Sequence, residues 1–255
     1  MSEHSHRPVA IVAGGTGGIG ASICQRLASD GYQVVSASRG KTSPGIESHG
    51  SILQFTCDVT SEAQCQSLVQ ETLNSFGRVD SMIYAAIGYH YGAPERHDAA
   101  TINGVFAANV FGAHLLSSAC YSMAMKGAGG GAICFLGSTA GSLALPNRSA
   151  YCASKAALAG LCRALAVDWA RFNIRVNCVS SAYVATDLEM SGASSGEWGY
   201  TIDDLRHRIP LGRLAQPREI AAAVAWLIGQ ESTYVSGVEL LVDGGWSAWA
   251  GHGER

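Results

Sequence analysis

Two side chains four residues apart, Tyr151 and Lys155, have the types and spacing that proton transfer requires. On a helix this spacing places the phenol and the ammonium on one face. A neighbouring cation lowers the pKa of a tyrosine, which is ordinarily about 10. Such a pair can exchange a proton with an alcohol or carbonyl oxygen. Ser138 lies thirteen residues earlier, just after an expected strand, where its hydroxyl could hold that oxygen. By itself, however, the spacing is also typical of an ordinary pair on a helix surface.

A glycine-rich loop, Gly14–Gly20, is the second feature that could bind a reactive group. Glycines allow backbone N–H groups to approach a pyrophosphate at the N-terminus of a helix. Two dinucleotide-binding patterns fit the loop, one using Gly15, Gly17 and Gly20 and the other Gly14, Gly18 and Gly20. A single pattern match is weak, but its position between an expected strand and an expected helix favours a dinucleotide over a simple turn.

The second expected strand ends in Ser36-Ala-Ser-Arg39, without an acidic residue. Enzymes that prefer NAD usually place Asp or Glu here to accept a hydrogen bond from the ribose 2′-hydroxyl. An arginine can instead pair with a 2′-phosphate. Arg39 alone could be a solvated surface cation, but the missing carboxylate favours NADP over NAD.

Short apolar runs alternate with helical patterns along the whole chain, and this alternation predicts the elements that position these residues. Strands are expected at residues 9–13, 33–38, 52–57, 81–86, 132–136, 175–179 and 238–242, and helices at about 18–29, 62–76, 104–126, 150–172 and 217–228. Strands that alternate with helices form right-handed crossovers and a mostly parallel sheet. We therefore expect an α/β Rossmann fold: one domain over residues 1–255, with a doubly wound seven-stranded sheet. The polar stretch Ser191–Tyr200 belongs to an expected lid at about residues 187–210, although it could be an ordinary loop.

Composition excludes several classes of protein. Hydrophobic residues make up 47% of the chain and charged residues 15%, and the net charge is −3, so neither a disordered chain nor a nucleic-acid-binding protein is expected. No uninterrupted apolar run approaches the length of a membrane helix. The eight cysteines form no CxxC and the eight histidines no zinc spacing. We expect reduced thiols, no metal, no membrane contact and a cytoplasmic location.

Taken together, the glycine loop, Ser138, Tyr151 and Lys155 resemble the short-chain dehydrogenase/reductase family, and particularly its 3-oxoacyl-carrier-protein-reductase-like members. The resemblance covers essentially the whole chain. It implies hydride transfer between NADP(H) and a carbonyl or secondary alcohol, with Tyr151 as general acid/base. It also implies that Lys155 lowers the pKa of Tyr151 and holds the nicotinamide ribose, that Ser138 positions the substrate, and that Asn109 shapes the long helix so that a water relays protons to Lys155. Such members are usually homotetramers joined through the two long helices and the C-terminal strands.

The resemblance and the strand ends together assign further site residues. Cofactor contacts are expected from Gly14, Thr16, Gly17, Gly18, Ile19, Gly20, Ser38, Arg39, Asp58, Val59, Ala85, Ala86, Tyr151, Lys155, Val184 and Thr186. Substrate contacts are expected from His90, Ser138, Leu145, Tyr183 and Trp198, whose apolar and aromatic mix favours a ketone, alcohol or 3-oxoacyl thioester with hydrophobic bulk.

Four positions depart from the family's pattern. Ala13 replaces a threonine before the glycine loop, and Tyr84-Ala-Ala-Ile87 replaces an asparagine-rich turn. Ser181-Ala182 replaces a Pro-Gly pair, and the glycine loop contains no basic residue. None of these positions belongs to the expected catalytic set. The alternative function is a non-catalytic dinucleotide sensor or scaffold, which would have no need of Asn109, Ser138, Tyr151 and Lys155 together.

Overall fold

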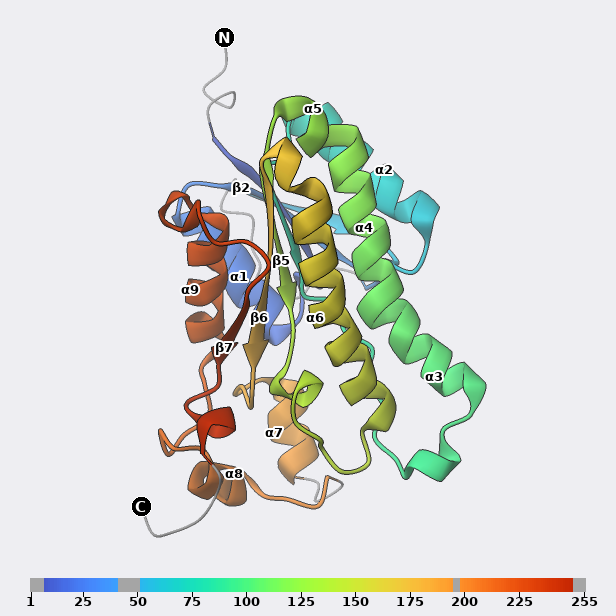
Figure 1. Ribbon diagram of the computed structural model, residues 1–255, viewed down its shortest axis with the longest axis vertical. Coiled ribbons are helices and arrows are strands. Elements are labelled where there is room, and N and C mark those ends of the chain that lie inside the picture. Colours follow the sequence, from blue (N-terminus) through green and yellow to red (C-terminus); the bar gives the residue numbers. More distant parts are fainter. Residues whose placement is uncertain (1–6, 41–50, 195–197, 250–255) are drawn as a thin grey trace.

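One parallel sheet organises the molecule (Figure 1). The computed structural model describes residues 7–40, 51–194 and 198–249. Its strands are β1 (Val9–Ala13), β2 (Gln33–Ser38), β3 (Ile52–Thr56), β4 (Ser81–Tyr84), β5 (Gly131–Leu136), β6 (Ile174–Ser181) and β7 (Glu239–Val242). They lie in the order β3-β2-β1-β4-β5-β6-β7, and each neighbouring pair is parallel. The expected seven-stranded Rossmann fold is confirmed.

Helices cover both faces of this sheet. They are α1 (Gly18–Ser29), α2 (Glu62–Phe76), α3 (Ala99–Phe106), α4 (Gly112–Cys120), α5 (Lys126–Ala128), α6 (Ser149–Trp169), α7 (Asp187–Ser194), α8 (Ile202–Arg208) and α9 (Pro217–Ile228). Helices α1 and α9 lie on one face, while α2, α4 and α6 lie on the other (Figure 1). Successive strand residues point to opposite faces, so Ile11 joins the core beneath α4 and α6 whereas Val12 joins the core beneath α1 and α9. Because both faces are covered, the central strand β1 is buried and apolar along its whole length.

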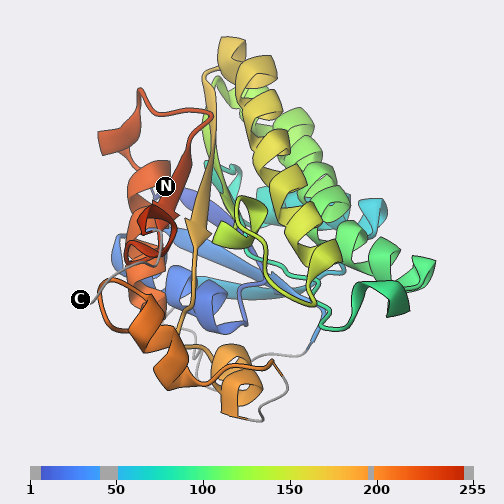
Figure 2. The same ribbon diagram turned by 60° about the horizontal axis from the view of Figure 1, so that its bottom comes forward.

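The strand order reverses between β1 and β4, and the site lies at this point. In open α/β sheets, ligands bind where the order reverses, outside the carboxyl ends of the strands. The glycine loop follows β1, Ala85 follows β4, Ser138 follows β5 and Ala182 follows β6. Helices α7 and α8 lie beyond the same edge of the sheet (Figures 1 and 2). Four separate segments therefore meet at one edge.

The segment after β6 differs from the polar loop that the sequence suggested. Helix α7 covers Asp187–Ser194, and α8 begins after Thr201, whose hydroxyl and Asp204 form a reciprocal capping box. Residues 195–197, which fall within the expected Ser191–Tyr200 loop, lie outside the described residues. Two short helices thus occupy much of the segment that we expected to act as a lid.

The long helix expected at 104–126 extends from Ala99 to Ala128 and contains two π-helical turns, Ala107–Phe111 and Tyr121–Met125. The hydroxyl of Tyr84, at the end of β4, donates a hydrogen bond to the Ala108 carbonyl in the first π turn. A side chain at Gly112 would collide with that hydroxyl. Tyr84, one of the departures from the family pattern, therefore braces the sheet against the helix, and Gly112 provides the room.

Two helical stretches, Ala99–Ala128 and Ser149–Phe172, satisfy simple length and hydropathy criteria for spanning a membrane, with mean hydropathies of 1.3 and 1.2. Neither stretch is an uninterrupted apolar run, so neither was expected from the sequence. Buried side chains of both stretches join the core on one face of the sheet. Other apolar side chains are exposed, among them Phe111 and Val167 at 57% and 77%. Association of several copies through these helices stays a prediction.

All eight cysteines lie in the described part of the chain, and none of them forms a disulfide. Seven are buried, whereas Cys152 is partly exposed. Burial raises the pKa of the Cys24 and Cys120 thiols to about 12. These thiols behave as small apolar side chains, as expected.

We expect Tyr84→Phe to lower the free energy of unfolding by roughly 1–2 kcal/mol, because the partly buried Ala108 carbonyl would lose the hydrogen bond from the Tyr84 hydroxyl. Urea denaturation followed by circular dichroism measures this change. Tyr234→Phe is the matched control, since Tyr234 is fully exposed, and it should stay within about 0.5 kcal/mol of the unsubstituted protein. Equal stabilities for the two variants would contradict the bracing role.

Candidate active site

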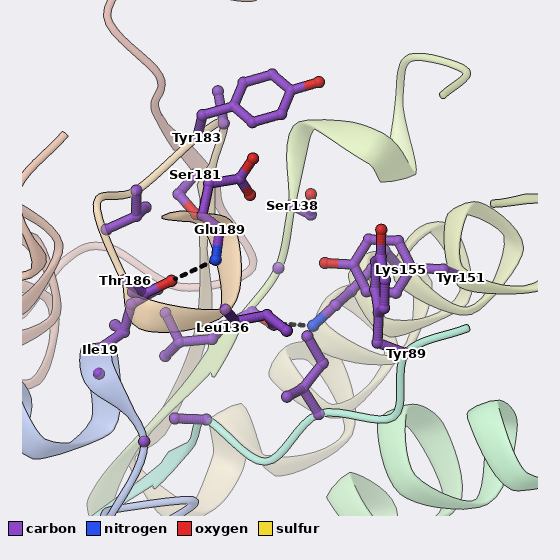
Figure 3. Close-up of a pocket in the computed structure, with 18 of the residues that line it drawn as sticks. Ile19, Tyr89, Leu136, Ser138, Tyr151, Lys155, Ser181, Tyr183, Thr186 and Glu189 are labelled. Atoms are coloured by element: carbon purple, nitrogen blue, oxygen red, sulfur yellow. Dashed lines mark hydrogen bonds between the residues drawn. The ribbon is translucent and has the colours of Figure 1, made fainter. Parts of the chain in front are cut away.

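A cavity of about 440 Å³ opens at the carboxyl edge of the sheet. Its walls come from the glycine loop, the end of β4, the end of β5, the start of α6, residues between Ser181 and Glu189, and the side chains of Trp198 and Tyr200. Figure 3 shows Ser138, Tyr151 and Lys155 on one side of this cavity and Ile19 and Thr186 on the other. The predicted proton-transfer residues and the predicted dinucleotide loop therefore line the same space.

Tyr151 lies in the first turn of α6, and its side chain is buried at the cavity wall. The Ser138 hydroxyl forms a hydrogen bond with it. That hydroxyl also accepts a hydrogen bond of 3.1 Å from the Ala140 backbone N–H, which fixes its direction. The backbone of β5 and the start of α6 thus bring two hydroxyl groups to one point.

Lys155 lies one helical turn further and is also buried. Its Nζ donates a 2.7 Å hydrogen bond to the Leu136 carbonyl and lies 5.7 Å from the centroid of the Tyr151 ring (Figure 3). Burial lowers the pKa of Lys155 to about 8. The ammonium therefore faces the cavity beside the phenol.

The pKa of Tyr151 differs from the expected lowering. Burial raises it to about 12, and the hydrogen bond from Ser138 opposes only part of this increase. Burial disfavours the charged phenolate, and the Lys155 ammonium hydrogen-bonds to a backbone carbonyl rather than to the phenol oxygen. In this structure, Tyr151 is consequently a neutral phenol at pH 7.

Asn109 lies within the first π turn and is completely buried. Its Oδ1 accepts a hydrogen bond of 2.7 Å from the Gly88 backbone N–H. Its Nδ2 donates to the Gly88 carbonyl and to the Ser154 Oγ, both at 2.8 Å. Asn109 does not line the cavity; it links the loop after β4 to the residue that precedes Lys155.

The glycine loop has the close approaches that a dinucleotide cradle requires. Gly14 has a φ of +80°, and a Cβ there would lie 2.6 Å from the Ala85 backbone. A Cβ on Gly18 would lie 2.9 Å from Thr186, and one on Gly20 would collide with Gly14. A Cβ on Gly17 would have no neighbour closer than 3.6 Å. A Cβ on Gly15 would also lie 2.4 Å from the Ser36 Oγ. Close contacts therefore require all three glycines of the pattern Gly14, Gly18 and Gly20, whereas in the other pattern they do not require Gly17.

A second cavity of about 320 Å³ continues from the glycine loop to the ends of β2 and β3. Arg39 and Asp58 both line it. Hydrogen bonds from Thr60 lower the pKa of Asp58, and the charge of Arg39 contributes to the same effect. Each of the sixteen predicted cofactor-binding residues lines one of the two cavities. These residues fit an extended dinucleotide.

The predicted substrate residues divide into two groups. Ser138, Leu145, Tyr183 and Trp198 line the 440 Å³ cavity. His90 does not; its ring packs edge-on against His97 at a centroid distance of 4.9 Å. The lining of this cavity therefore does not support a substrate contact from His90, which stays a prediction.

The predicted site residues leave out several residues of the cavity wall, among them Tyr89, Arg148, Glu189 and Tyr200. Arg148 immediately precedes α6 and Glu189 lies in α7. Tyr89 precedes His90, and Arg148 lies three residues before Tyr151. Both residues are thus next to predicted site residues, and this proximity in sequence could have identified them. No motif marks Glu189.

We expect the burial of Lys155 to cost stability in a pH window that follows from its pKa. The folded value of about 8 is below the ordinary 10.5, so between these values the unfolded chain binds more protons and stability rises with pH. The difference corresponds to roughly 3 kcal/mol. The free energy of unfolding of the unsubstituted protein, relative to that of Lys155→Met, should therefore rise from pH 7.5 to 10. Urea denaturation at each pH measures this change. Lys126→Met is the control, because Lys126 is exposed. If the free energy of unfolding changed equally with pH in all three proteins, the lowered pKa of Lys155 would be contradicted.

A family model described as "Enoyl-(Acyl carrier protein) reductase" matches residues 13–247. The chain is 35% identical to L-fucose dehydrogenase of Mus musculus over 97% of this chain and 90% of that protein. It is 33% identical to D-threitol dehydrogenase of Mycolicibacterium smegmatis over 94% and 92%. It is also 33% identical to the human 3-oxoacyl-[acyl-carrier-protein] reductase over 93% and 97%.

Among solved structures, a single-residue variant of actinorhodin polyketide ketoreductase with NADPH superimposes with a TM-score of 0.89 at 28% identity, covering 98% of this chain and all of that one. The fold, the shared sequence and the match over most of the chain agree with one another. The chain therefore belongs to the short-chain dehydrogenase/reductase family of oxidoreductases.

Proposed function

We propose that the protein transfers a hydride between NADP(H) and a carbonyl or secondary alcohol carbon. The observation that carries this proposal is the meeting of Tyr151, Ser138 and Lys155 in the same cavity that the glycine loop lines. A scaffold or sensor would need the loop but not the three side chains.

Proton transfer is the contribution of the chain's own residues. When bound, the nicotinamide supplies or accepts the hydride. During reduction, Tyr151 donates its proton to the carbonyl oxygen, which becomes the hydroxyl; during oxidation, the phenolate takes that proton back. The neutral phenol at pH 7 suits the reductive direction. Ser138 holds the reacting oxygen, and its position beside Tyr151 supports this role.

The phenolate that forms on Tyr151 needs stabilisation, because it is buried. The Lys155 ammonium lies beside the ring, and the phenol belongs to the first turn of α6, where the helix dipole favours negative charge. Lys155 would also hold the nicotinamide ribose. Asn109 acts through position, since its amide fixes both the loop after β4 and Ser154, the neighbour of Lys155.

The preference for NADP rests on the adenosine end of the site. Arg39 lines the second cavity and is exposed there, so its guanidinium can reach a 2′-phosphate. Among the described residues, β2 ends without an acid that would repel it. The NADPH-bound ketoreductase of similar fold supports the same choice.

Relatives support the reaction class more strongly than any one substrate. Their names refer to a sugar, a polyol and a 3-oxoacyl chain. All three contain a hydroxyl or carbonyl carbon that can exchange a hydride. The side chains that line the cavity of this chain must therefore determine which of these substrate classes it binds.

We expect Tyr151→Phe to reduce turnover by about 10²–10⁴-fold, because the phenol supplies the proton. NADPH binding, measured by the change in cofactor fluorescence, should remain within about threefold. Tyr234→Phe, at a fully exposed position, is the matched control and should retain full turnover. Undiminished turnover in Tyr151→Phe would refute the proposed mechanism.

Arg39→Gln should lower kcat/KM for NADPH by about 10- to 100-fold, which corresponds to the loss of one charge-assisted hydrogen bond. The kcat/KM for NADH should change by less than about threefold, because NADH has no 2′-phosphate. Initial rates with both cofactors measure the two effects. Arg218→Gln is the control, since Arg218 is exposed and lines neither cavity. Equal losses with both cofactors, or an unsubstituted protein that prefers NADH, would show that the assignment of Arg39 is wrong.

A further inference from the structure

The substrate end of the cavity contains a charged cluster that proton transfer does not require. We call Tyr89, Arg148, Glu189, Trp198 and Tyr200 the Arg148 cluster. All five line the 440 Å³ cavity. They come from three segments: the loop after β4, the residue before α6, and the α7–α8 region.

Arg148 is the centre of this cluster and is only 3% exposed. Its guanidinium carbon lies 5.2 Å from the centroid of the Trp198 ring and 5.4 Å from that of Tyr200. The Tyr89 and Tyr91 rings complete the enclosure at 5.9 and 5.0 Å. These contacts fix the position of the cation through cation–π attraction.

Hydrogen bonds use only part of the guanidinium. Nε donates to the Tyr89 hydroxyl, one terminal nitrogen to the Pro146 carbonyl at 3.3 Å and the other to the Tyr200 hydroxyl at 3.1 Å. A guanidinium has five N–H groups, two on each terminal nitrogen. The contacts with described residues thus leave one N–H on each terminal nitrogen for a ligand.

The Arg148 cluster also contains an acidic residue, Glu189. The Tyr200 hydroxyl donates a hydrogen bond of 3.1 Å to Oε1 of Glu189. Glu189 is half-buried, and burial raises its pKa to about 7, whereas Tyr200 and the charge of Arg148 act to lower it. One phenol therefore joins a permanent donor, Arg148, to an acceptor, Glu189.

The cluster is adjacent to the reacting groups. The Tyr89 ring contacts the Tyr151 ring edge-on at 5.2 Å and the Trp198 ring at 5.5 Å. A small substrate with its reacting oxygen at Tyr151 would therefore extend its remaining atoms toward Arg148 and Glu189.

Three kinds of substrate make different demands on this cluster. A hydrophobic group would leave the two remaining N–H groups of Arg148 and the second carboxyl oxygen of Glu189 without partners. A carboxylate on the substrate would pair with Arg148 but would be repelled by the carboxylate of Glu189. A hydroxyl both donates and accepts, so neighbouring hydroxyls can serve Arg148 and Glu189 at once, while the C–H face of the molecule packs on Trp198.

We propose that the substrate is a small neutral polyhydroxylated compound, a polyol or the corresponding sugar, whose hydroxyls beyond the reacting carbon bind Arg148, Tyr200 and Glu189. This proposal rests on the proposed function and revises the hydrophobic substrate suggested by sequence. In the oxidative direction the reacting carbon would lose a hydride to NADP⁺ and its hydroxyl would lose a proton to the deprotonated form of Tyr151, the phenolate, so an alcohol becomes a carbonyl.

The test compares four-carbon alcohols of equal chain length: 2-butanol, 2,3-butanediol and butane-1,2,3,4-tetrol, with NADP⁺, and 3-hydroxybutanoate as the anionic member. We expect kcat/KM to rise by at least about tenfold from 2-butanol to the tetrol. In Arg148→Met and in Tyr200→Phe, the ratio of the tetrol value to the 2-butanol value should fall by about 10- to 100-fold. The exposed Arg218→Met is the matched control and should keep the ratio of the unsubstituted protein.

The outcomes separate this proposal from the proposed function. Turnover of 2-butanol that depends on Tyr151, without preference for the tetrol, would overturn the substrate class alone. A preference for 3-hydroxybutanoate that Arg148→Met abolishes would also overturn it and would indicate an anionic substrate. If no alcohol is turned over, thermal denaturation with NADP⁺ decides. A stabilisation by the tetrol that Tyr200→Phe removes would support the binding site although the proposed function fails, and no stabilisation would overturn both.

Discussion

A completely buried amide, that of Asn109 in the long helix, joins this helix to two segments of the site, the loop after β4 and helix α6. Buried polar groups must find partners, and this side chain finds three: both backbone groups of Gly88 and the hydroxyl of Ser154. These hydrogen bonds determine where the chain leaves β4, how the long helix is wound at that level, and how deep α6 sits. Tyr151 and Lys155 belong to the same helix as Ser154, so the hydrogen bond that holds Ser154 also restricts the positions of these two residues. The proton-transfer groups therefore depend on a contact that lies outside the cavity.

Local patterns allowed much of the fold to be predicted. The bounds of β1 and α1 agree with expectation, because an apolar run, a set of glycines and a helical pattern follow one another without ambiguity. The Arg148 cluster could not be predicted in the same way. Its residues are scattered from position 89 to position 200, and only the folded chain brings them together. The raised pKa of Tyr151 also escaped prediction, since burial is a property of the fold rather than of the Tyr-x-x-x-Lys spacing.

The departures from the family pattern acquire a physical explanation at one place. At the position of the asparagine-rich turn in the family's pattern, this chain has Tyr84, whose phenol reaches the backbone of the π turn at Ala108. The larger side chain needs space, and Gly112 provides it. Tyr84 and Gly112 are therefore complementary in size, and together they hold the end of β4 against the long helix. Ser181 and Ala182, which replace the Pro-Gly pair of the family's pattern, line the cavity directly. This departure therefore changes the surface of the cavity.

The distribution of the cysteines has a practical consequence for measurement. Seven of the eight thiols are enclosed by the core, and the remaining one, Cys152, immediately follows Tyr151 on α6. Alkylating reagents act on accessible thiols, so a fluorophore or spin label added to the unsubstituted protein would attach next to the proton-transfer residue. The natural sequence already contains a spectroscopic reporter position within one residue of its chemistry, without the removal of a single competing cysteine.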